Sequence, residues 1–306
     1  MPADDVPPTR RRISPYVPLT LTVLFWSGNW VVGRGIRDDV PPIALSFWRW
    51  VIAFVLLLPL AWPHLRRQRL QLLRHWRILA LLGVFGGACH NALTYTGLVY
   101  TTATNGVLLA SATPIMIIGL SWAILGKRLQ APEWLGVMVS LSGVLVIVCQ
   151  GDWTRLLELR PNVGDLWVLA AMFCWALYTV MLVWRPGGLH PYAFLAAVSV
   201  VGLAALLPFY LWEIAAGKLI RPNAYALSAI AYAGVFPALL GFIFWNLAVA
   251  QVGGNRAGQF MHLMPAFGTI LSILFLDERP YLFHLAGIVL ILFGIYLTHT
   301  VAPRPR

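Results

Sequence analysis

Charged residues are scarce in this sequence: 22 lysines and arginines and 11 aspartates and glutamates make up 11% of its 306 residues. Soluble domains carry about 25% charged residues, and the mean hydropathy here is +0.76. This composition excludes a soluble protein. Because a helix crosses a membrane in about 20 residues, the chain has room for ten crossings joined by short loops.

Acidic residues are missing from the centres of the hydrophobic runs, since all 11 lie in loops or near predicted helix ends. Exporters of cations that use a proton gradient often rely on a carboxylate within the membrane. The sequence therefore favours neutral or zwitterionic solutes, carried by facilitated diffusion or with weak proton coupling through His262. The three cysteines indicate neither a disulfide framework nor a metal site, and we expect no metal and no cofactor.

Enzyme signatures are also missing. The sequence has no H-E-x-x-H motif, no phosphate-binding G-x-x-x-x-G-K-[ST] loop and no G-x-S-x-G elbow, so we expect no enzymatic activity. The net charge of +11 does not predict nucleic-acid binding, because the basic residues lie in short loops beside hydrophobic runs. We expect two partners, a small-molecule substrate and the lipid bilayer. A monomer is sufficient for this purpose, and the sequence leaves dimerisation open.

Ten hydrophobic runs separated by proline, glycine or charge predict an all-α integral membrane protein with ten transmembrane helices. The runs lie near residues 16–36, 43–62, 78–98, 104–126, 133–150, 164–184, 191–212, 226–250, 257–276 and 281–301. The tails and loops on one side of this arrangement hold fourteen basic residues, and the opposite loops hold seven. Cytoplasmic loops are enriched in lysine and arginine, so both termini are expected in the cytoplasm.

An internal repeat divides the chain into residues 1–150 and 151–306. A shift of 151 residues places Gly83-Val84-Phe85 on Gly234-Val235-Phe236. The same shift pairs Pro114 with Pro265, Arg128 with Arg279, Gly136 with Gly287 and Gly143 with Gly294. Because each half has five predicted helices, an odd number, the two halves must run through the membrane in opposite directions. Inverted repeats of this kind place a substrate site near the bilayer midplane, where the halves meet.

Several segments resemble the EamA-type drug/metabolite transporter family. They are Trp26-Ser27-Gly28-Asn29-Trp30-Val31, Phe47-Trp48-Arg49-Trp50, Pro114, Gly136, Gly143, Gly164-Asp165 and Trp175-Ala176-Leu177-Tyr178. The resemblance implies two inverted five-helix repeats around a central cavity, and export of metabolites such as amino acids across the bacterial inner membrane. Within the family the sequence is most similar to the bacterial aromatic amino acid exporters. A multidrug or other metabolite exporter and a channel-like facilitator stay as alternatives.

Polar and aromatic residues recur at matching places in the two halves. In the first predicted helix Trp26, Asn29 and Trp30 share one face, and in the sixth Trp175, Tyr178 and Thr179 have the same spacing. Together with residues of the third, fourth, eighth and ninth helices they form the predicted substrate-binding set. Its members are Trp26, Asn29, Trp30, Asn91, Tyr95, Ser111, Trp175, Tyr178, Thr179, Trp245, Gln259 and His262. The alternative is that these residues serve only as packing and interhelical hydrogen bonds.

Four further residues stand out within the hydrophobic runs. Pro114, Pro237 and Pro265 interrupt otherwise continuous helices and are hinge candidates, although kinks that serve only packing are equally compatible with the sequence. Arg49 is the one basic residue well inside a run. Two interpretations of Arg49 stay open: its side chain snorkels to the membrane surface or satisfies backbone groups, or it pairs with a substrate carboxylate.

Overall fold

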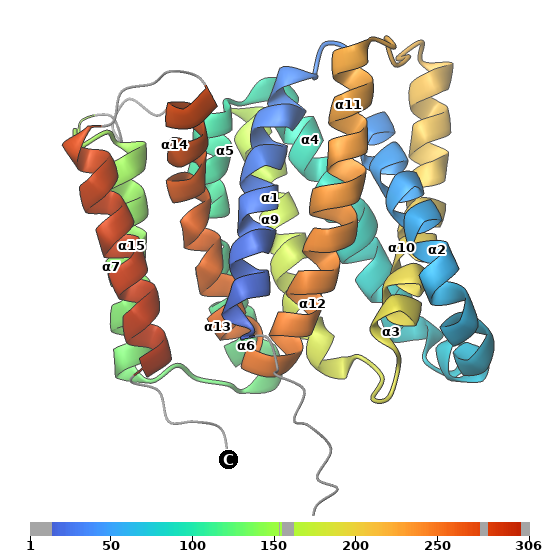
Figure 1. The fold of residues 1–306 in the computed structure, drawn as a ribbon, viewed down its shortest axis with the longest axis horizontal. Coiled ribbons are helices and arrows are strands. Elements are labelled where there is room, and N and C mark those ends of the chain that lie inside the picture. The colour runs from blue at the N-terminus through green and yellow to red at the C-terminus, as the bar shows by residue number, and fades with distance from the viewer. Residues whose placement is uncertain (1–13, 153, 155–161, 276–280, 301–306) are drawn as a thin grey trace, which may run out of the picture.

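The computed structural model describes residues 14–152, 154, 162–275 and 281–300, and the regular structure of these residues is helical throughout (Figure 1). The first half contains α1 (Tyr16–Gly35), α2 (Pro42–Arg74), α3 (Trp76–Leu82), η1 (Gly83–Cys89), α4 (His90–Tyr100), α5 (Ala103–Ala110), α6 (Thr113–Leu125) and α7 (Ala131–Val148). The second half contains α9 (Val163–Met181), η2 (Leu182–Trp184), α10 (Pro191–Ala215), α11 (Ala224–Ala233), η3 (Gly234–Leu240), α12 (Gly241–Val252), α13 (Gly254–Gln259), η4 (Phe260–His262), α14 (Leu263–Phe275) and α15 (Leu282–Thr300).

The helices follow the hydrophobic runs, with two differences. Helix α2 continues to Arg74 rather than ending near residue 62, although Pro59 and Pro63 lie within it. Its extension is amphipathic, because Leu65 and Leu72 pack against the core while the basic side chains between them face outward. The run at 104–126 is broken between α5 and α6, where Pro114 enters the first turn of α6.

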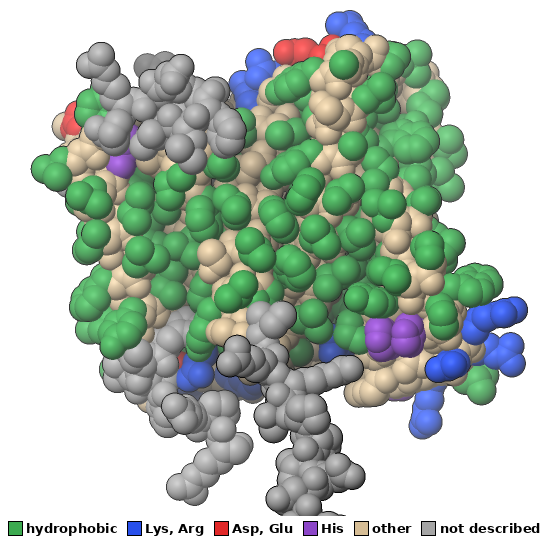
Figure 2. Space-filling model, in the orientation of Figure 1, with side chains coloured by type: hydrophobic (Ala, Val, Ile, Leu, Met, Phe, Trp, Pro, Cys, Tyr) green, Lys and Arg blue, Asp and Glu red, His purple; other side chains and the backbone are tan. Residues whose placement is uncertain are grey.

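Among the described residues, six stretches are long and apolar enough to cross a membrane: Pro42–Arg74, Trp76–Tyr100, Leu108–Leu125, Val163–Trp184, Pro191–Ala215 and Ala224–Val252. Two shorter apolar helices, α7 and α15, pack against each other at one edge of the molecule (Figure 1). Figure 2 shows a broad band of apolar side chains on one face, with basic side chains gathered beyond its two ends. This distribution is the one expected of a protein in a bilayer.

Two π-helical segments occupy equivalent places in the halves. Segment η1 spans Gly83–Cys89 and η3 spans Gly234–Leu240, so both ends differ by the 151 residues of the repeat. A glycine at the start of each lets another helix come close: a Cβ on Gly83 would lie 2.5 Å from the Cβ of Val201 in α10, and one on Gly234 would lie 2.7 Å from the Cβ of Ile52 in α2. Helices α10 and α2 therefore pack directly on the two π segments.

The centre of the molecule is unusually rich in large aromatic side chains. Trp50, Trp175, Trp245, Tyr178 and Phe242 are among its largest fully buried residues. They come from α2, α9 and α12, which meet around α1 and α4. This aromatic core surrounds the candidate site.

Candidate functional site

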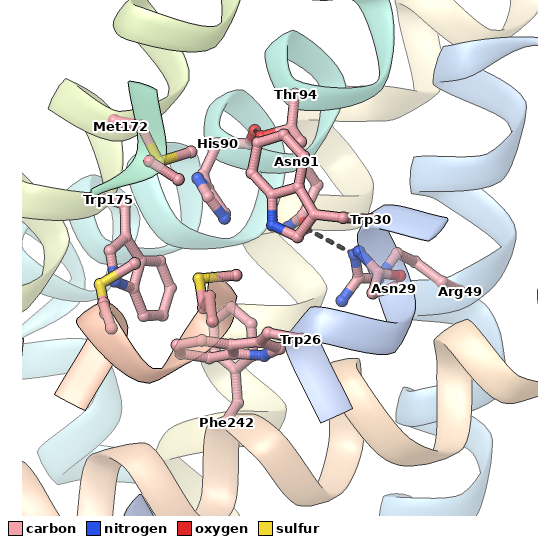
Figure 3. A pocket seen from close by; sticks show the side chains of 13 residues that line it. Trp26, Asn29, Trp30, Arg49, His90, Asn91, Thr94, Met172, Trp175 and Phe242 are labelled. Atoms are coloured by element: carbon pink, nitrogen blue, oxygen red, sulfur yellow. Dashed lines mark hydrogen bonds between the residues drawn. The ribbon is translucent and has the colours of Figure 1, made fainter. Parts of the chain in front are cut away.

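A small cavity lies between the two halves, close to the middle of the helices. Its volume of about 30 Å³ equals the space that one water takes up in the liquid. Figure 3 shows side chains of α1, α2, α4, α9 and α12 converging on it. The lining residues are Trp26, Asn29, Trp30, Arg49, His90, Asn91, Thr94, Ala110, Met172, Trp175, Phe242, Met261 and Met264. We call this space the central cavity.

The central cavity brings together five of the twelve residues that the sequence predicts for substrate binding. These are Trp26, Asn29, Trp30, Asn91 and Trp175. The faces with matched spacing in the first and sixth predicted helices therefore lie next to each other around the cavity. Further lining residues did not enter the prediction because most of them are apolar, as with Met172, Met261 and Met264, and nothing in a single hydrophobic run marks such a residue as part of a cavity.

A layer of aromatic rings adjoins the central cavity on the side where α12 continues toward its end. Trp175 contacts Tyr178 and Trp245, with ring centroids 5.1 and 5.4 Å apart, and Trp26 lies 4.8 Å from Trp175. Tyr178 also donates a hydrogen bond of 2.7 Å to Oδ1 of Asn246. We call Trp26, Trp175, Tyr178 and Trp245 the aromatic layer. All four side chains are buried.

A larger vestibule of about 580 Å³ lies where α6, η2 and α12 end and α13 begins. In Figure 1 this is the face on which α1 begins and α15 ends. Thr179 and Asn246 line its inner part, and Lys127, Arg185 and Arg256 line it together with Glu133, whose carboxylate lies 4.0 Å from Nε of Arg256. The vestibule and the central cavity are thus separate spaces, with the aromatic layer between the residues that line them.

Several polar atoms around the aromatic layer are buried without a hydrogen-bond partner. They are Nε1 of Trp175, Nε1 of Trp245, Oγ1 of Thr179 and Nδ2 of Asn246. A buried donor without a partner costs free energy, on the order of 1–3 kcal/mol. Such atoms would gain partners if water or a polar solute passed through the layer.

Three predicted residues lie away from the central cavity. His262 is fully buried, with its ring nitrogens bonded to Ser140 and to the carbonyl of Ser111. Gln259 is also fully buried, and neither atom of its amide has a partner. Ser111 and His262 therefore form a second polar group with Ser140 of α7, and neither they nor Gln259 line the central cavity.

A polar network enters the central cavity from α2. Nη1 of Arg49 donates hydrogen bonds of 2.7 Å to Oδ1 of Asn91 and to the hydroxyl of Tyr95. The Tyr95 hydroxyl in turn donates to Oδ1 of Asn29 at 2.8 Å. Only 1% of Arg49 is exposed, so the interpretation that this side chain snorkels to the surface is wrong. Its inward course depends on how α2 crosses α4, which the sequence of α2 alone does not encode.

The π segments supply acceptors for side chains at the cavity. Nδ2 of Asn91 lies 3.3 Å from the carbonyl oxygens of both Gly86 and Gly87 in η1. Nε1 of Trp26 donates to the carbonyl of Pro237 in η3 at 3.1 Å. Wider helical turns free backbone carbonyls that an α-helix would use internally, and such segments are frequent at functional sites. Both π segments thus fix the orientation of a lining side chain.

The hinge candidates all lie at irregular points of the helices. Pro114 stands in the first turn of α6, directly after the break that follows α5. Pro237 lies inside η3, and Pro265 lies in the first turn of α14, after the tight turn of η4. Each proline therefore marks a place where the helical hydrogen-bond pattern changes.

A third space, a groove of about 1080 Å³, is lined by residues of α4, α10 and the segment after α1. Its walls are mostly apolar and include Leu93, Leu206 and Phe209, with Arg37 and Lys218 at its margin. It contains none of the twelve predicted residues. The central cavity, where the predicted residues and the buried arginine meet, is the better candidate site.

Comparison with known proteins gives consistent results. The EamA-like transporter family matches residues 15–149 and again 162–300. The chain is 26% identical over 286 residues to an uncharacterized transporter of Archaeoglobus fulgidus, covering 92% of this chain and 95% of that protein. It is 28% identical to a probable terminal-alkyne amino-acid exporter of Streptantibioticus cattleyicolor, covering 91% of each. A crystal structure of a protein with 20% identity matches its fold with a TM-score of 0.74, over 96% of this chain and 100% of that chain.

These relatives are named as transporters, which points away from an enzyme. The two family matches together cover most of the chain, and the apolar helices fit a multi-pass membrane protein. The chain is a membrane transporter and belongs to the EamA-like transporter family.

Proposed function

We propose that this transporter exports amino acids with apolar or aromatic side chains from the cytoplasm to the periplasm across the bacterial inner membrane. The observation that carries the proposal is the order of spaces along the bundle. Helices α9 and α12 contribute to both the vestibule and the central cavity, and three of the four rings of the aromatic layer come from these two helices, between the two sets of lining residues. The similarity to a probable amino-acid exporter supports this class of solute.

The proposed topology has ten crossings in two inverted repeats, residues 1–150 and 151–306, with both termini in the cytoplasm. Packing between the halves supports it. Helix α4 packs on α9 as α12 packs on α1, and η1 packs on α10 as η3 packs on α2. In each case the third predicted helix of one half contacts the first two of the other. The vestibule would then face the cytoplasm, and one chain would be the working unit.

The proposed mechanism is alternating access, in which one half rocks against the other. The central cavity has the volume of one water, whereas sites for small molecules commonly hold about 300–1,000 Å³. Binding therefore requires the aromatic layer to separate, and the unpartnered donors of Trp175 and Trp245 would then meet water or solute. Pro114, Pro237 and Pro265 are the proposed hinges, because each lies where the helical pattern already changes.

Tryptophan faces suit a zwitterionic amino acid. An ammonium group over an aromatic ring gains about 0.5–2 kcal/mol, and Trp26, Trp30 and Trp175 line the cavity. The same rings offer an apolar surface to a large side chain. Aspartate, glutamate and organic dications should therefore be carried poorly. The predicted residues outside the cavity, Tyr178, Thr179 and Trp245 on the vestibule side and Ser111, Gln259 and His262 near α7, would act along the path or support it.

The test is counterflow of labelled amino acids in liposomes that contain the purified chain. We expect saturable exchange of phenylalanine and leucine, little exchange of aspartate, and a large loss of exchange in Trp175→Ala. A matched control is Trp134→Ala, because Trp134 is 40% exposed on the outer side of α7, and this variant should exchange at the parental rate. Exchange that does not saturate would favour the alternative of a channel-like facilitator, and preference for a dication would favour a multidrug exporter.

A further inference from the structure

Arg49 is a buried cation whose described partners are all neutral. Its side chain is 1% exposed, and its two hydrogen bonds go to the amide of Asn91 and the hydroxyl of Tyr95. Nε of Arg49 is buried and has no partner. A guanidinium group carries five N–H donors and stays charged in proteins. The hydrogen bonds of Arg49 therefore leave most of its donors, and all of its charge, uncompensated.

Acidic residues lie elsewhere in the part of the chain that the structure describes. The two ion pairs found there join Arg37 to Asp38 and Arg256 to Glu133, both outside the central cavity. The thirteen residues that line the cavity include no aspartate or glutamate. A charge that is buried without an opposite charge is strongly unfavourable. A site built around such a cation is suited to a ligand that brings the negative charge.

We propose that Arg49 binds the carboxylate of the transported solute in the central cavity. This inference rests on the proposed function and names the chemical group that the site selects. A planar carboxylate can accept two parallel hydrogen bonds from a guanidinium group, one from each of two nitrogens, and Nε of Arg49 is a donor without a partner. Trp26, Trp30 and Trp175 then face the rest of the solute, as their positions around the cavity in Figure 3 indicate.

Binding at Arg49 also changes contacts between helices. Arg49 in α2 holds Asn91 and Tyr95 of α4, and Tyr95 holds Asn29 of α1. A carboxylate that binds end-on takes one N–H of Nη1 and one of Nη2, and so releases one of the two bonds that tie α2 to α4. Because Asn91 also bonds the carbonyls of η1, the released amide keeps partners of its own. Solute binding is thereby linked to a looser contact between helices that must move during transport.

The site is selective for acids over amines, and four phenyl compounds of similar size separate the two. Phenylalanine has both charged groups, 3-phenylpropionate keeps only the carboxylate, and phenethylamine and phenylalaninamide have lost the carboxylate. We measure how each competes with labelled phenylalanine, and how each shifts the melting temperature of the purified chain. The parent should bind phenylalanine and 3-phenylpropionate at least tenfold more tightly than phenethylamine and phenylalaninamide.

Variants of the network separate binding from structure. Arg49→Gln should lose at least tenfold in affinity for 3-phenylpropionate and lose the preference for acids, whereas Arg49→Lys should keep part of both. Tyr95→Phe removes the bonds to Arg49 and Asn29 and leaves the charge of Arg49, so it should lower the melting temperature while keeping the preference for acids. A purely structural role for Arg49 would instead leave the preference for acids unchanged in Arg49→Gln, which would overturn the inference.

Competition measured on the unmutated chain tests for a carboxylate site even if Arg49→Gln does not fold. Equal competition by phenethylamine and 3-phenylpropionate would contradict the carboxylate site but not amino-acid export. Binding of 3-phenylpropionate without exchange of phenylalanine would contradict amino-acid export but not the carboxylate site. Failure of all four compounds to bind would contradict both hypotheses.

Discussion

Oγ of Ser140 lies 2.6 Å from Nδ1 of His262 and joins α7 to the start of α14. Nε2 of the same ring lies 3.1 Å from the carbonyl oxygen of Ser111. Because a carbonyl oxygen only accepts, Nε2 must carry the proton and donate it to Ser111, and Nδ1 then accepts from the Ser140 hydroxyl. Both nitrogens of the neutral ring are thus engaged, and His262 serves as a connection between helices.

The first prediction follows from this arrangement of His262. A glutamine can replace both bonds, since its amide donates and its carbonyl accepts, so His262→Gln should keep the stability and the rate of exchange. His262→Ala removes both ring hydrogen bonds, although the Ser140 hydroxyl can still donate to the carbonyl of Val137, and should lower the free energy of unfolding by about 1–3 kcal/mol. Thermal unfolding and counterflow at pH 5.5 and 8 measure both effects. Loss of pH-driven accumulation in His262→Gln would show that this ring carries protons during transport.

The second prediction concerns the contact between α7 and α15. A Cβ on Gly143 would lie 2.6 Å from the carbonyl oxygen of Gly287, so Gly143→Val must push the two helices apart. Overpacking of this kind destabilises by about 1–3 kcal/mol. Gly119→Ala is the matched control, because a Cβ at Gly119 in α6 meets nothing within 4 Å, and it should be neutral or slightly stabilising. Equal melting temperatures for both variants would contradict a tight glycine contact.

The third prediction concerns the buried carboxylate of Glu213 in α10. Its two oxygens accept hydrogen bonds from the backbone N–H groups of Ile43 and Ala44, at 3.2 and 2.8 Å, and so satisfy the start of α2. Glu213→Ala should lower the free energy of unfolding by about 1–3 kcal/mol, because both N–H groups lose their acceptors. Glu213→Gln keeps one acceptor and should lie between the parent and the alanine variant. Chemical unfolding measures this order, and any other order would count against the capping role.

The fourth prediction is a pH dependence where the C-terminal part of α2 meets the start of α10. The rings of His64 and His190 stack with centroids 3.5 Å apart. Burial, and secondarily the positive charge of His64, lowers the pKa of His190 below its ordinary value of 6.5. Since the folded state favours neutral His190, the contact is stable above about pH 6.5 and weakens as the pH falls from there through the lowered pKa.

Melting temperatures at pH 7.5 and pH 5 measure this effect. The parent should lose more stability on acidification than His64→Phe, which keeps the stack and removes one charge. His75→Gln, a histidine at the end of α2 outside the stack, should behave as the parent does. An identical response of the parent and His64→Phe to acid would mean that the stacked pair does not titrate.

The fifth prediction is the orientation of the chain. Arg67 and Lys218 are both exposed, and they lie toward opposite ends of α2: Arg67 is in its last part, and Lys218 follows Glu213, whose carboxylate binds the first turn of that helix. With both termini in the cytoplasm, a cysteine at position 67 should react with an impermeant maleimide only after cells are opened, and one at position 218 should react in intact cells. The parent chain, with its native cysteines, gives the background. Labelling on swapped sides would reverse the topology and place the vestibule outside.

The sequence predicts the helices well because each hydrophobic run is bounded by proline, glycine or charge. It also predicts part of the candidate site, since Trp26, Asn29 and Trp30 share a face at helical spacing and do line the cavity. Spacing within one helix cannot say which faces meet. For that reason Ser111, Gln259 and His262, chosen by their place in the repeat, do not line the central cavity.

The position of the Arg49 side chain could not be predicted from the sequence of α2 either. Its neighbours in α2 are apolar apart from Ser46, so the hydrophobic pattern gives little preferred direction to its side chain. The direction is decided by Asn91 and Tyr95, which α4 places at the crossing with α2. The shift of 151 residues, in contrast, is visible in the sequence and recurs in the bounds of η1 and η3.

The two π segments impose a constraint on insertions and deletions. A π-helical turn holds one residue more than an α-helical turn, and each residue advances an α-helix by about 100°. Deleting a single residue from η1 can therefore convert the wide turn into an ordinary α turn and leave α4 in its orientation. A residue added to the first turn of α4, in contrast, would rotate Asn91 and Tyr95 by about that angle away from Arg49. Loops between helices commonly tolerate changes in length. In this transporter the π segments in the third and eighth predicted helices should tolerate the loss of one residue in a similar way, at the expense of the carbonyl contacts of Asn91.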